Sequence, residues 1–481
     1  MKRAFLALSL ACAAALAAVG PIAARQQPPD RSAAPTPGAP PALKLPAIQR
    51  RTLSNGLPVW IVELHKVPVV HVALVVKSGA GADPQGKFGV ASLTADMLDE
   101  GAGKRSSLEI ADAVDYLGAS LSTSSTPDAS FVDLHVPVAR LEDGLTIMAD
   151  VALRPTFPER ELQRVREELL ASLVQAEDDP ASLVQFAFPR LVFGSGHRYG
   201  TMVFGTASAV KGLSVADLRQ FHARQYVPSN SAVIVTGDVT TASVVARLES
   251  AFGSWTGSPS PAADLPASAQ LKSRQIYLID KPGAAQSQIR IGWVGLPRST
   301  PDYFAVRVLN TILGGSFTSR LNQNLREEHG YAYGASSTFD MRVAAGPFYA
   351  AAGVQTDKTA EALTEFFKEL DNIRKPIPAE EVEKAKNYLA LLMPRNFETT
   401  ESMAGSLGGM FVYGLPPDYY ATYTDRVRAV TPAAVQRAAE RYIQPDKFAV
   451  VVVGDRKTIE PGIKALNLGP IKTVEISEVM K

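Results

Sequence analysis

Residues 89–101 read Gly89-Val90-Ala91-Ser92-Leu93-Thr94-Ala95-Asp96-Met97-Leu98-Asp99-Glu100-Gly101. The run begins and ends at a glycine. On a helix, positions i and i+4 share a face, so Ser92 and Asp96 would point the same way, with Ala95 beside them. The identity of these three side chains decides what the helix can do, and the rest of the chain shows what surrounds it.

Composition places the chain among ordinary globular proteins of more than one domain. It has 481 residues, 46% of them hydrophobic and 20% charged, and single cores stop growing at roughly 250–300 residues. The net charge is +1, and we find no basic run or basic helix face. Nucleic acid is therefore not expected as a partner.

The N-terminus has the layout of a secretory signal peptide. Lys2 and Arg3 precede an apolar run, and small residues suited to cleavage follow near Ala24. Loss of residues 1–24 removes these two cations and no acid, which changes the net charge from +1 to −1. We predict export to the periplasm; an N-terminal membrane anchor is the alternative. The only cysteine, Cys12, lies in the signal, so the mature chain has no thiol nucleophile, and it shows no further membrane-spanning run.

Beyond the signal, residues 25–47 are rich in proline and alanine and predict an extended tether. From there the chain predicts strands at 57–62, 69–76, 119–124 and 130–137. It predicts helices that begin at Ser106, at Leu141 and after Pro158, the last running to about Ala176. The pair Ser106 and Glu109 has capping-box spacing.

An internal repeat indicates that one unit has been duplicated. The segment from Tyr226 to Asp238 reappears from Tyr442 to Asp455, the helix start at Ser214 matches Thr431, and Pro158 matches Pro378. The offsets fall between 216 and 220 residues, so three matches lie in near register. Each half mixes hairpin-like strands with helices, which predicts two α+β domains with largely antiparallel sheets.

The predicted organisation follows from these boundaries. The ranges are 1–24 for the signal, 25–47 for the tether, 48–255 for the N-terminal domain, 256–272 for a linker and 273–481 for the C-terminal domain.

The frame of residues 89–101 resembles the metal helix of the pitrilysin (insulinase) family of inverted-motif zinc peptidases. There G-x-A leads into H-x-x-E-H, followed by Met-Leu and a glycine turn. In that family the two histidines hold Zn²⁺ and the glutamate takes a proton from the metal-bound water. Here the three slots are Ser92, Ala95 and Asp96. The resemblance implies a clamshell of two homologous domains over residues 48–470.

Two acids of the family's metal site remain. Arg166-Glu167-Glu168-Leu169 matches the context of the third zinc ligand, which makes Glu168 its equivalent and Glu161 the equivalent of a supporting acid. A neutral serine hydroxyl is a poor zinc ligand, and Ala95 leaves no base, a role worth roughly 10²–10⁴-fold in rate. We therefore expect no metal bound by this chain, with Asp96 and Glu168 solvated or paired with arginine.

A second motif, Arg326-Glu327-Glu328-His329-Gly330-Tyr331-Ala332-Tyr333, resembles the R-E-x-x-G-x-A-Y motif of the same family. There the arginine and the tyrosine reach across the clamshell, bind substrate backbone and stabilise the oxyanion. A guanidinium and a phenol can supply that stabilisation. Segments 334–339 and 347–354 are candidate strands for lining the peptide site, but the sequence does not fix which edge is free.

No other catalytic arrangement appears in the sequence. The six histidines show no i, i+4 pair and no H-E-x-x-H frame. His71 and His135 alternate with apolar neighbours on predicted strands, and we interpret them as structural.

In the family that this chain resembles, some bacterial members work as heterodimers in which one subunit supplies zinc and base and the other the arginine–tyrosine pair. The resemblance therefore implies a non-catalytic subunit of a heteromeric zinc endopeptidase, and the N-terminus places it in the periplasm as an expectation. Arg326 and Tyr333 would act in trans on peptide held with a zinc-bearing partner of the same family. A structural or peptide-binding protein is one alternative, by analogy with respiratory-complex core subunits of this family. A peptidase with an unorthodox metal site built on Ser92, Asp96 and Glu168 is another.

Overall fold

The computed structural model describes residues 45–258 and 265–480. The predicted signal peptide, nearly all of the tether and part of the predicted linker lie outside these residues. All elements described below belong to the unit Lys44–Lys481. None of the helices within the described ranges has the length and apolarity that crossing a membrane requires.

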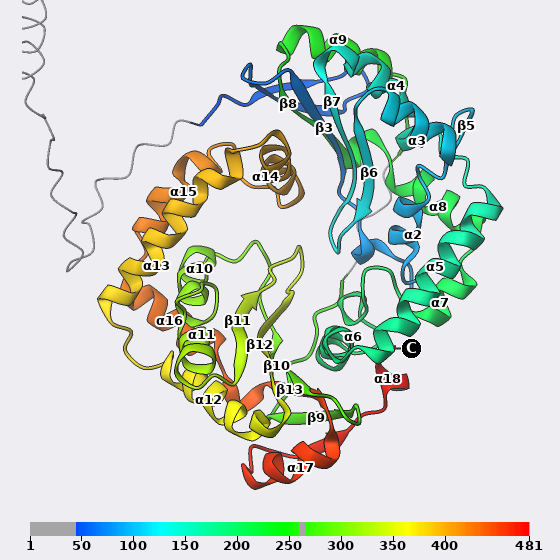
Figure 1. Ribbon diagram of the computed structural model, residues 1–481. Coiled ribbons are helices and arrows are strands. Elements are labelled where there is room, and N and C mark those ends of the chain that lie inside the picture. Colours follow the sequence, from blue (N-terminus) through cyan, green and yellow to red (C-terminus); the bar gives the residue numbers. More distant parts are fainter. Residues whose placement is uncertain (1–44, 259–264, 481) are drawn as a thin grey trace, which may run out of the picture. The chain divides into compact units, whose positions relative to one another are not determined.

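The first half of the chain forms a six-stranded sheet (Figure 1). Its neighbours pair antiparallel except β2 with β8, which run parallel. In spatial order the strands are β1 (Gln49–Thr52), β2 (Pro58–Glu63), β8 (Ser231–Gly237), β3 (Val69–Val76), β7 (Ser130–Pro137) and β6 (Ser120–Ser125). A separate small hairpin joins β4 (Gly101–Ala102) to β5 (Arg105–Ser106).

The second half repeats this sheet. Its order is β11 (Ala332–Phe339), β12 (Pro347–Gln355), β10 (Gln286–Val294), β13 (Ala449–Gly454), β9 (Gln275–Asp280) and β14 (Ile471–Thr473). Here β9 runs parallel to both β13 and β14, and the remaining pairs are antiparallel. Five strands of each sheet therefore follow the same order and directions, which confirms two homologous α+β domains with largely antiparallel sheets.

Helices cover both sheets. Those of the first half are α2 (Val90–Asp96), α3 (Ser107–Tyr116), α4 (Leu141–Leu153), α5 (Glu159–Asp178), α6 (Pro180–Phe193), α7 (Ala207–Gly212), α8 (Val215–Gln225) and α9 (Thr241–Phe252). Those of the second half are α10 (Tyr303–Leu313), α11 (Arg320–Asn322), α12 (Thr359–Asn372), α13 (Ala379–Leu392), α14 (Thr400–Val412), α15 (Tyr419–Arg428), α16 (Pro432–Tyr442), α17 (Arg456–Ala465) and α18 (Ile476–Met480). A π-helical turn, Gln323–Glu328, continues α11.

The local signals identified in the sequence set these boundaries. Ser106 accepts the backbone N–H of Glu109, whose carboxylate accepts the Ser106 N–H in return, so the predicted capping box is confirmed. Helix α4 spans the predicted Leu141–Leu153. Helix α5 starts directly after Pro158 and α13 directly after Pro378, as the repeat predicts.

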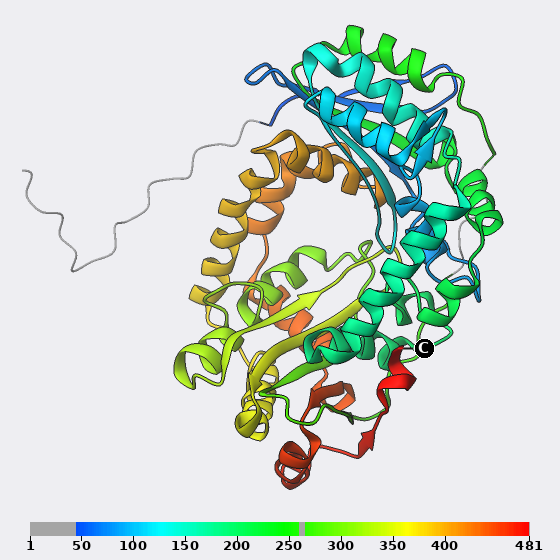
Figure 2. The same cartoon turned by 45° about the vertical axis from the view of Figure 1, so that its right-hand side comes forward.

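Each half contributes a helix to the sheet of the other half (Figures 1 and 2). Helix α14 packs on β3 and β8, and its Leu407 shares a core with Val75 and Ile234. Gly408 permits this close approach, since a Cβ there would lie 3.3 Å from Val75 Cγ2. In return α6 packs on β10 and β13, where Phe188 shares a core with Val451. The two halves thus share buried apolar surface and are not independent.

One carboxylate joins the first sheet to the second half. Asp128 lies in the turn between β6 and β7. It accepts hydrogen bonds from the Tyr199 hydroxyl at 2.7 Å, the Val343 N–H at 2.9 Å and the Tyr413 hydroxyl at 3.3 Å. Two of these donors come from the C-terminal half, so the turn is held at the boundary between the halves.

Candidate functional site

Helix α2 (Val90–Asp96) carries the altered motif. Its N-terminus is fixed by Asp83, whose carboxylate accepts the Gly89 N–H at 2.6 Å, the Ala91 N–H at 2.9 Å and Arg198 Nη2 at 2.6 Å. Asp83 and Arg198 are both buried. Gly89 has φ +99°, and a Cβ there would lie 2.3 Å from the Phe204 carbonyl oxygen. The start of α2 is therefore fixed by buried contacts that do not involve Ser92, Ala95 or Asp96.

The slots themselves cannot perform the family's zinc chemistry. Ala95 is fully buried and Ser92 half-buried. Asp96 reaches solvent, but the protein around it restricts hydration and raises its pKa to about 6. The nearby Asp99 carboxylate adds to this rise, and a hydrogen bond from Ser92 opposes it. A neutral hydroxyl, a methyl group and a carboxyl that is costly to ionise leave no strong metal ligand on this helix.

The acids on α5 are paired with an arginine. Arg164 lies between three carboxylates: Nη2 is 2.5 Å from Glu100, Nε is 2.8 Å from Glu161 and Nη1 is 2.9 Å from Glu168. Glu168 is therefore ion-paired with the guanidinium of Arg164, one helical turn away. Within the described ranges, no group of three or more histidines, cysteines and acids placed to hold a metal includes Asp96, Glu161 or Glu168. These residues do not fit the zinc site of the family.

The raised pKa of Asp96 leads to a measurable pH dependence. The folded state holds the Asp96 proton up to about pH 6, whereas an unfolded aspartate releases it near pH 4. The folded state therefore binds more protons between these values, so this group makes the wild type lose stability as pH rises from about 4 to 6. Asp96→Asn cannot ionise, so it should be more stable at pH 7.5 by up to about 1 kcal/mol after allowance for solvent screening.

Urea unfolding at pH 4.5 and 7.5 measures this difference. The advantage of Asp96→Asn should be smaller at the lower pH, whereas the exposed Asp112→Asn serves as a control that should shift neither curve. An equal effect of Asp96→Asn at both values would contradict the assignment.

The second motif presents its two side chains together. Arg326 lies on the π-helical turn and Tyr333 on β11, with the guanidinium carbon 5.2 Å from the Tyr333 ring and 4.7 Å from the Phe317 ring. Tyr333 is 88% exposed and Phe317 61% exposed. The nearest acid to Arg326 is Glu327, at 3.4 Å. The arginine is thus held by aromatic faces and keeps donors for another ligand.

The backbone around these residues is also irregular. Strand β11 is the edge of the second sheet and pairs with β12 only, with a bulge between Ala332 and Ala335. Asn322 Oδ1 accepts the Ala335 N–H at 3.1 Å and so ties the bulge to the helix that carries Arg326. Of the two candidate strands, segment 334–339 therefore lies at a sheet edge, whereas segment 347–354 is paired on both sides.

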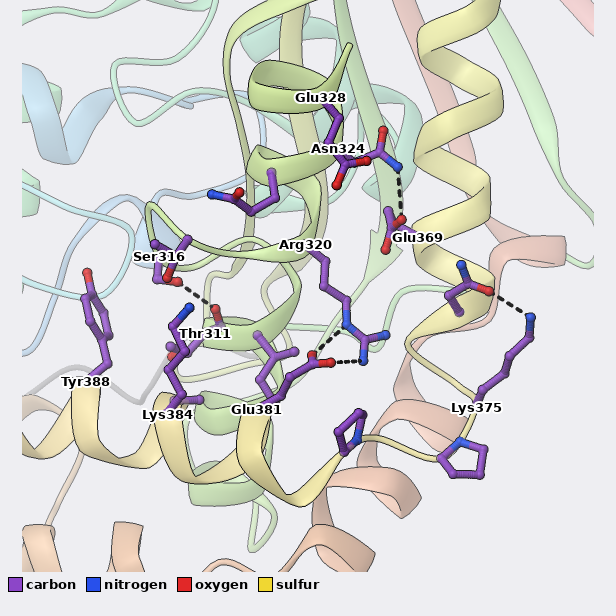
Figure 3. Close-up of a pocket in the computed structure, with 17 residues that line it drawn as sticks. Thr311, Ser316, Arg320, Asn324, Glu328, Glu369, Lys375, Glu381, Lys384 and Tyr388 are labelled. Atoms are coloured by element: carbon purple, nitrogen blue, oxygen red, sulfur yellow. Dashed lines mark hydrogen bonds and ion pairs between the residues drawn. The ribbon is translucent and has the colours of Figure 1, made fainter. Parts of the chain in front are cut away.

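A cavity of about 570 Å³ lies beside the π-helical turn, between α10, α12 and α13 (Figure 3). Asn324 and Glu328 line it, but Arg326 and Tyr333 do not. Asn324 donates to Glu365 at 2.7 Å and to Glu369 at 3.0 Å, and Arg320 makes a two-point ion pair with Glu381 at 2.8 and 3.1 Å. These contacts join the π-helical turn and α11 to α12 and α13, and so fix the backbone that carries Arg326.

Sequence reasoning missed one group of side chains. His71, His135 and Glu401 each offer a ligand atom, and these atoms lie within 4.8 Å of one another. The histidines are on different strands and Glu401 is on a helix of the other half. No local spacing brings them together, so only strand register and the packing of α14 could have revealed the group.

Two profiles of one peptidase family match this chain. The profile of the insulinase family (peptidase family M16) matches residues 59–197, and the profile of the peptidase M16 inactive domain matches residues 212–389. The chain belongs to peptidase family M16.

Relatives of similar length match most of this chain. An uncharacterised zinc protease of Streptomyces coelicolor is 25% identical over 85% of this chain and 90% of its own. A non-peptidase homologue of Helicobacter pylori is 22% identical over 83% and 92%. The crystal structure of a peptidase M16 inactive domain from Pseudomonas fluorescens superposes with a TM-score of 0.79 and 26% identity, covering 85% of this chain and 98% of that chain.

Proposed function

We propose that this chain is a non-catalytic subunit of a heteromeric zinc endopeptidase. It would supply Arg326 and Tyr333 to an active site whose metal ion and base belong to a family member with an intact H-x-x-E-H motif. The observation that carries the proposal is an asymmetry. An arginine and a tyrosine are exposed together, while the metal helix of the same chain holds Ser92, Ala95 and Asp96.

The chemistry of the pair supports this role. A guanidinium and a phenol both donate hydrogen bonds, and donors placed where negative charge develops on a scissile carbonyl stabilise the transition state. The exposed edge of β11 offers backbone groups to an extended peptide, which could add as a further strand. Peptide is therefore the substrate class we propose, and the N-terminal sequence pattern supports action in the periplasm.

The altered motif and the name of the Helicobacter pylori relative, a non-peptidase homologue, support inactivity of the isolated chain. Loss of both imidazoles and of the base removes the metal ligands and the proton acceptor together. Acids that remain, such as Glu168, are paired with Arg164 and do not restore either function.

Reconstitution tests the proposal. The purified chain should cleave no fluorogenic peptide alone, and cleavage should appear when it is mixed with a family member that carries H-x-x-E-H and is encoded beside it. Replacing the glutamate of the partner's motif by glutamine should abolish that cleavage. Chelator-sensitive cleavage by this chain alone would contradict the proposal, as would a partner whose activity does not change on mixing. Peptide binding without any cleavage in the mixture would favour a peptide-binding role.

A further inference from the structure

Two histidines face each other on the first sheet, on the side that α14 covers. His71 on β3 is the register partner of His135 on β7. Alternation along β3 sends Val70 and Val72 into the core of the first half, whereas His71, Ala73 and Val75 point toward α14. The His71 side chain is only 8% exposed and that of His135 is 31% exposed. The pair is therefore sheltered but can be reached from one side.

Helix α14 brings a carboxylate to this pair. Its first turn is anchored where the Thr236 hydroxyl of β8 donates to the Thr400 carbonyl oxygen at 2.8 Å. The next residue, Glu401, places Oε1 3.2 Å from His135 Nδ1. Glu401 belongs to the second half of the chain and the histidines to the first, so the group lies where the two halves meet.

The hydrogen bonding of this group is incomplete. His71 Nε2 lies 3.1 Å from Asp133 Oδ1, and since a carboxylate only accepts, Nε2 carries the proton and the neutral ring has a lone pair on Nδ1. His71 Nδ1 and His135 Nδ1 are buried and have no hydrogen-bond partner among the described residues. The short distance from His135 Nδ1 to Glu401 lacks hydrogen-bond geometry. Buried polar nitrogens without partners are costly, and a cation bound through a lone pair on each Nδ1 would satisfy both.

We propose that His71 Nδ1, His135 Nδ1 and the Glu401 carboxylate bind one divalent transition-metal ion of the zinc type. Two imidazoles, one carboxylate and a water form a common four-coordinate set for zinc. Bonds of about 2.0–2.1 Å in a tetrahedron place ligand atoms roughly 3.3 Å apart. The distance of 3.2 Å between Glu401 Oε1 and His135 Nδ1 already matches. A ring nitrogen of His71 lies within 4.8 Å of a ligand atom on each of the other two residues, so a small movement of the His71 ring would complete the set.

Asp133 completes the arrangement from outside. A metal-binding histidine usually donates its other nitrogen to a carboxylate, which fixes the ring and strengthens it as a ligand. Asp133 makes that contact with His71. The ion would join α14 of the second half to β3 and β7 of the first and so link the two halves. Its ligands are separate from the altered motif on α2. This proposal differs from the sequence-based expectation that the chain binds no metal, and the titration below decides between the two.

Metal titration of the full mature chain, stripped with a chelator, tests this inference. Zn²⁺ should bind at one ion per chain and raise the melting temperature, and Co²⁺ should give the intense visible absorption of a four-coordinate site. His135→Gln and Glu401→Gln should each weaken Zn²⁺ binding by about 100-fold or more. Asp133→Asn should weaken it by about 10–100-fold, the range measured for outer-shell partners. Positions 135 and 401 are chosen because both side chains are partly exposed, so the variants should fold.

Two controls distinguish the proposed site from other histidines and from the altered motif on α2. His65→Gln removes an exposed histidine that contacts Asp238 at 2.7 Å, and it should bind Zn²⁺ as the wild type does. The double variant Asp96→Asn, Glu168→Gln should also bind normally. The inference is overturned if Zn²⁺ does not bind, if His135→Gln and Glu401→Gln bind like His65→Gln, or if the double variant loses the ion. All these readouts use the isolated chain, so they are independent of the proposed activity in a complex.

Discussion

Arg326→Ala should lower kcat of the reconstituted peptidase by about 10²–10³-fold, the loss measured when one donor to an oxyanion is removed. The guanidinium is held over Phe317 and Tyr333 rather than in a strong ion pair. Its removal should therefore leave the fold intact and take away a donor that acts in the transition state. The measurement is peptide cleavage at saturating partner, with kcat and KM determined separately.

Tyr333→Phe should give a loss of similar size, since it deletes only the phenolic hydroxyl of a side chain that packs against little else. Matched controls come from the first half. Arg160→Ala and Tyr116→Phe change exposed residues of the same types and should leave kcat unchanged. Wild-type kcat in both Arg326→Ala and Tyr333→Phe would show that the pair does not act on the substrate, and would favour a structural role for the chain.

Asp83→Ala should lower the free energy of unfolding by about 3–5 kcal/mol, the cost of removing one partner from a buried ion pair. Burial raises the pKa of Asp83 to about 6, although Arg198 and the N–H groups of Gly89 and Ala91 oppose that rise, so the group is ionised at pH 7.5. Its loss would leave Arg198 buried without its anion and the start of α2 without a cap.

Chemical denaturation at pH 7.5, followed by circular dichroism, measures this change. Asp115→Ala removes an exposed aspartate and should change stability by no more than about 0.5 kcal/mol. A drop below about 1 kcal/mol in Asp83→Ala would mean that the pair is not a principal support of α2. A large effect would show that the buried Asp83–Arg198 pair stabilises the region that carries α2.

Much of the fold could be predicted because its signals are local. The alternation of residues 130–137, the capping box at Ser106 and the proline starts of α5 and α13 each determine an element within a few residues. The internal repeat then predicted that the second half contains a sheet like that of the first. The packing of α6 and α14 on the sheet of the other half could not be predicted. An apolar helix face indicates that the helix is buried, but not which sheet it packs against.

The candidate site residues also differ in how far the sequence predicts them. Arg326 and Tyr333 are seven residues apart in a short motif, and the structure brings them together at an edge strand. The replacement of both zinc ligands, at Ser92 and Asp96, and of the base, at Ala95, could also be seen directly. By contrast, His71 and Glu401 are 330 residues apart, and interpreting His71 as a structural residue followed from its apolar neighbours alone. Tertiary contacts of this kind leave no periodic trace in the sequence.

The exchange of helices has a consequence for how the protein is made. The last strand of the first sheet ends at Gly237, but α14, which covers one face of that sheet, begins only at Thr400, 163 residues later. A growing chain therefore presents Ala73, Val75 and Ile234 to water until most of the second half has been synthesised. The face of the first sheet that α14 covers is therefore completed only when residues 400–412 are present.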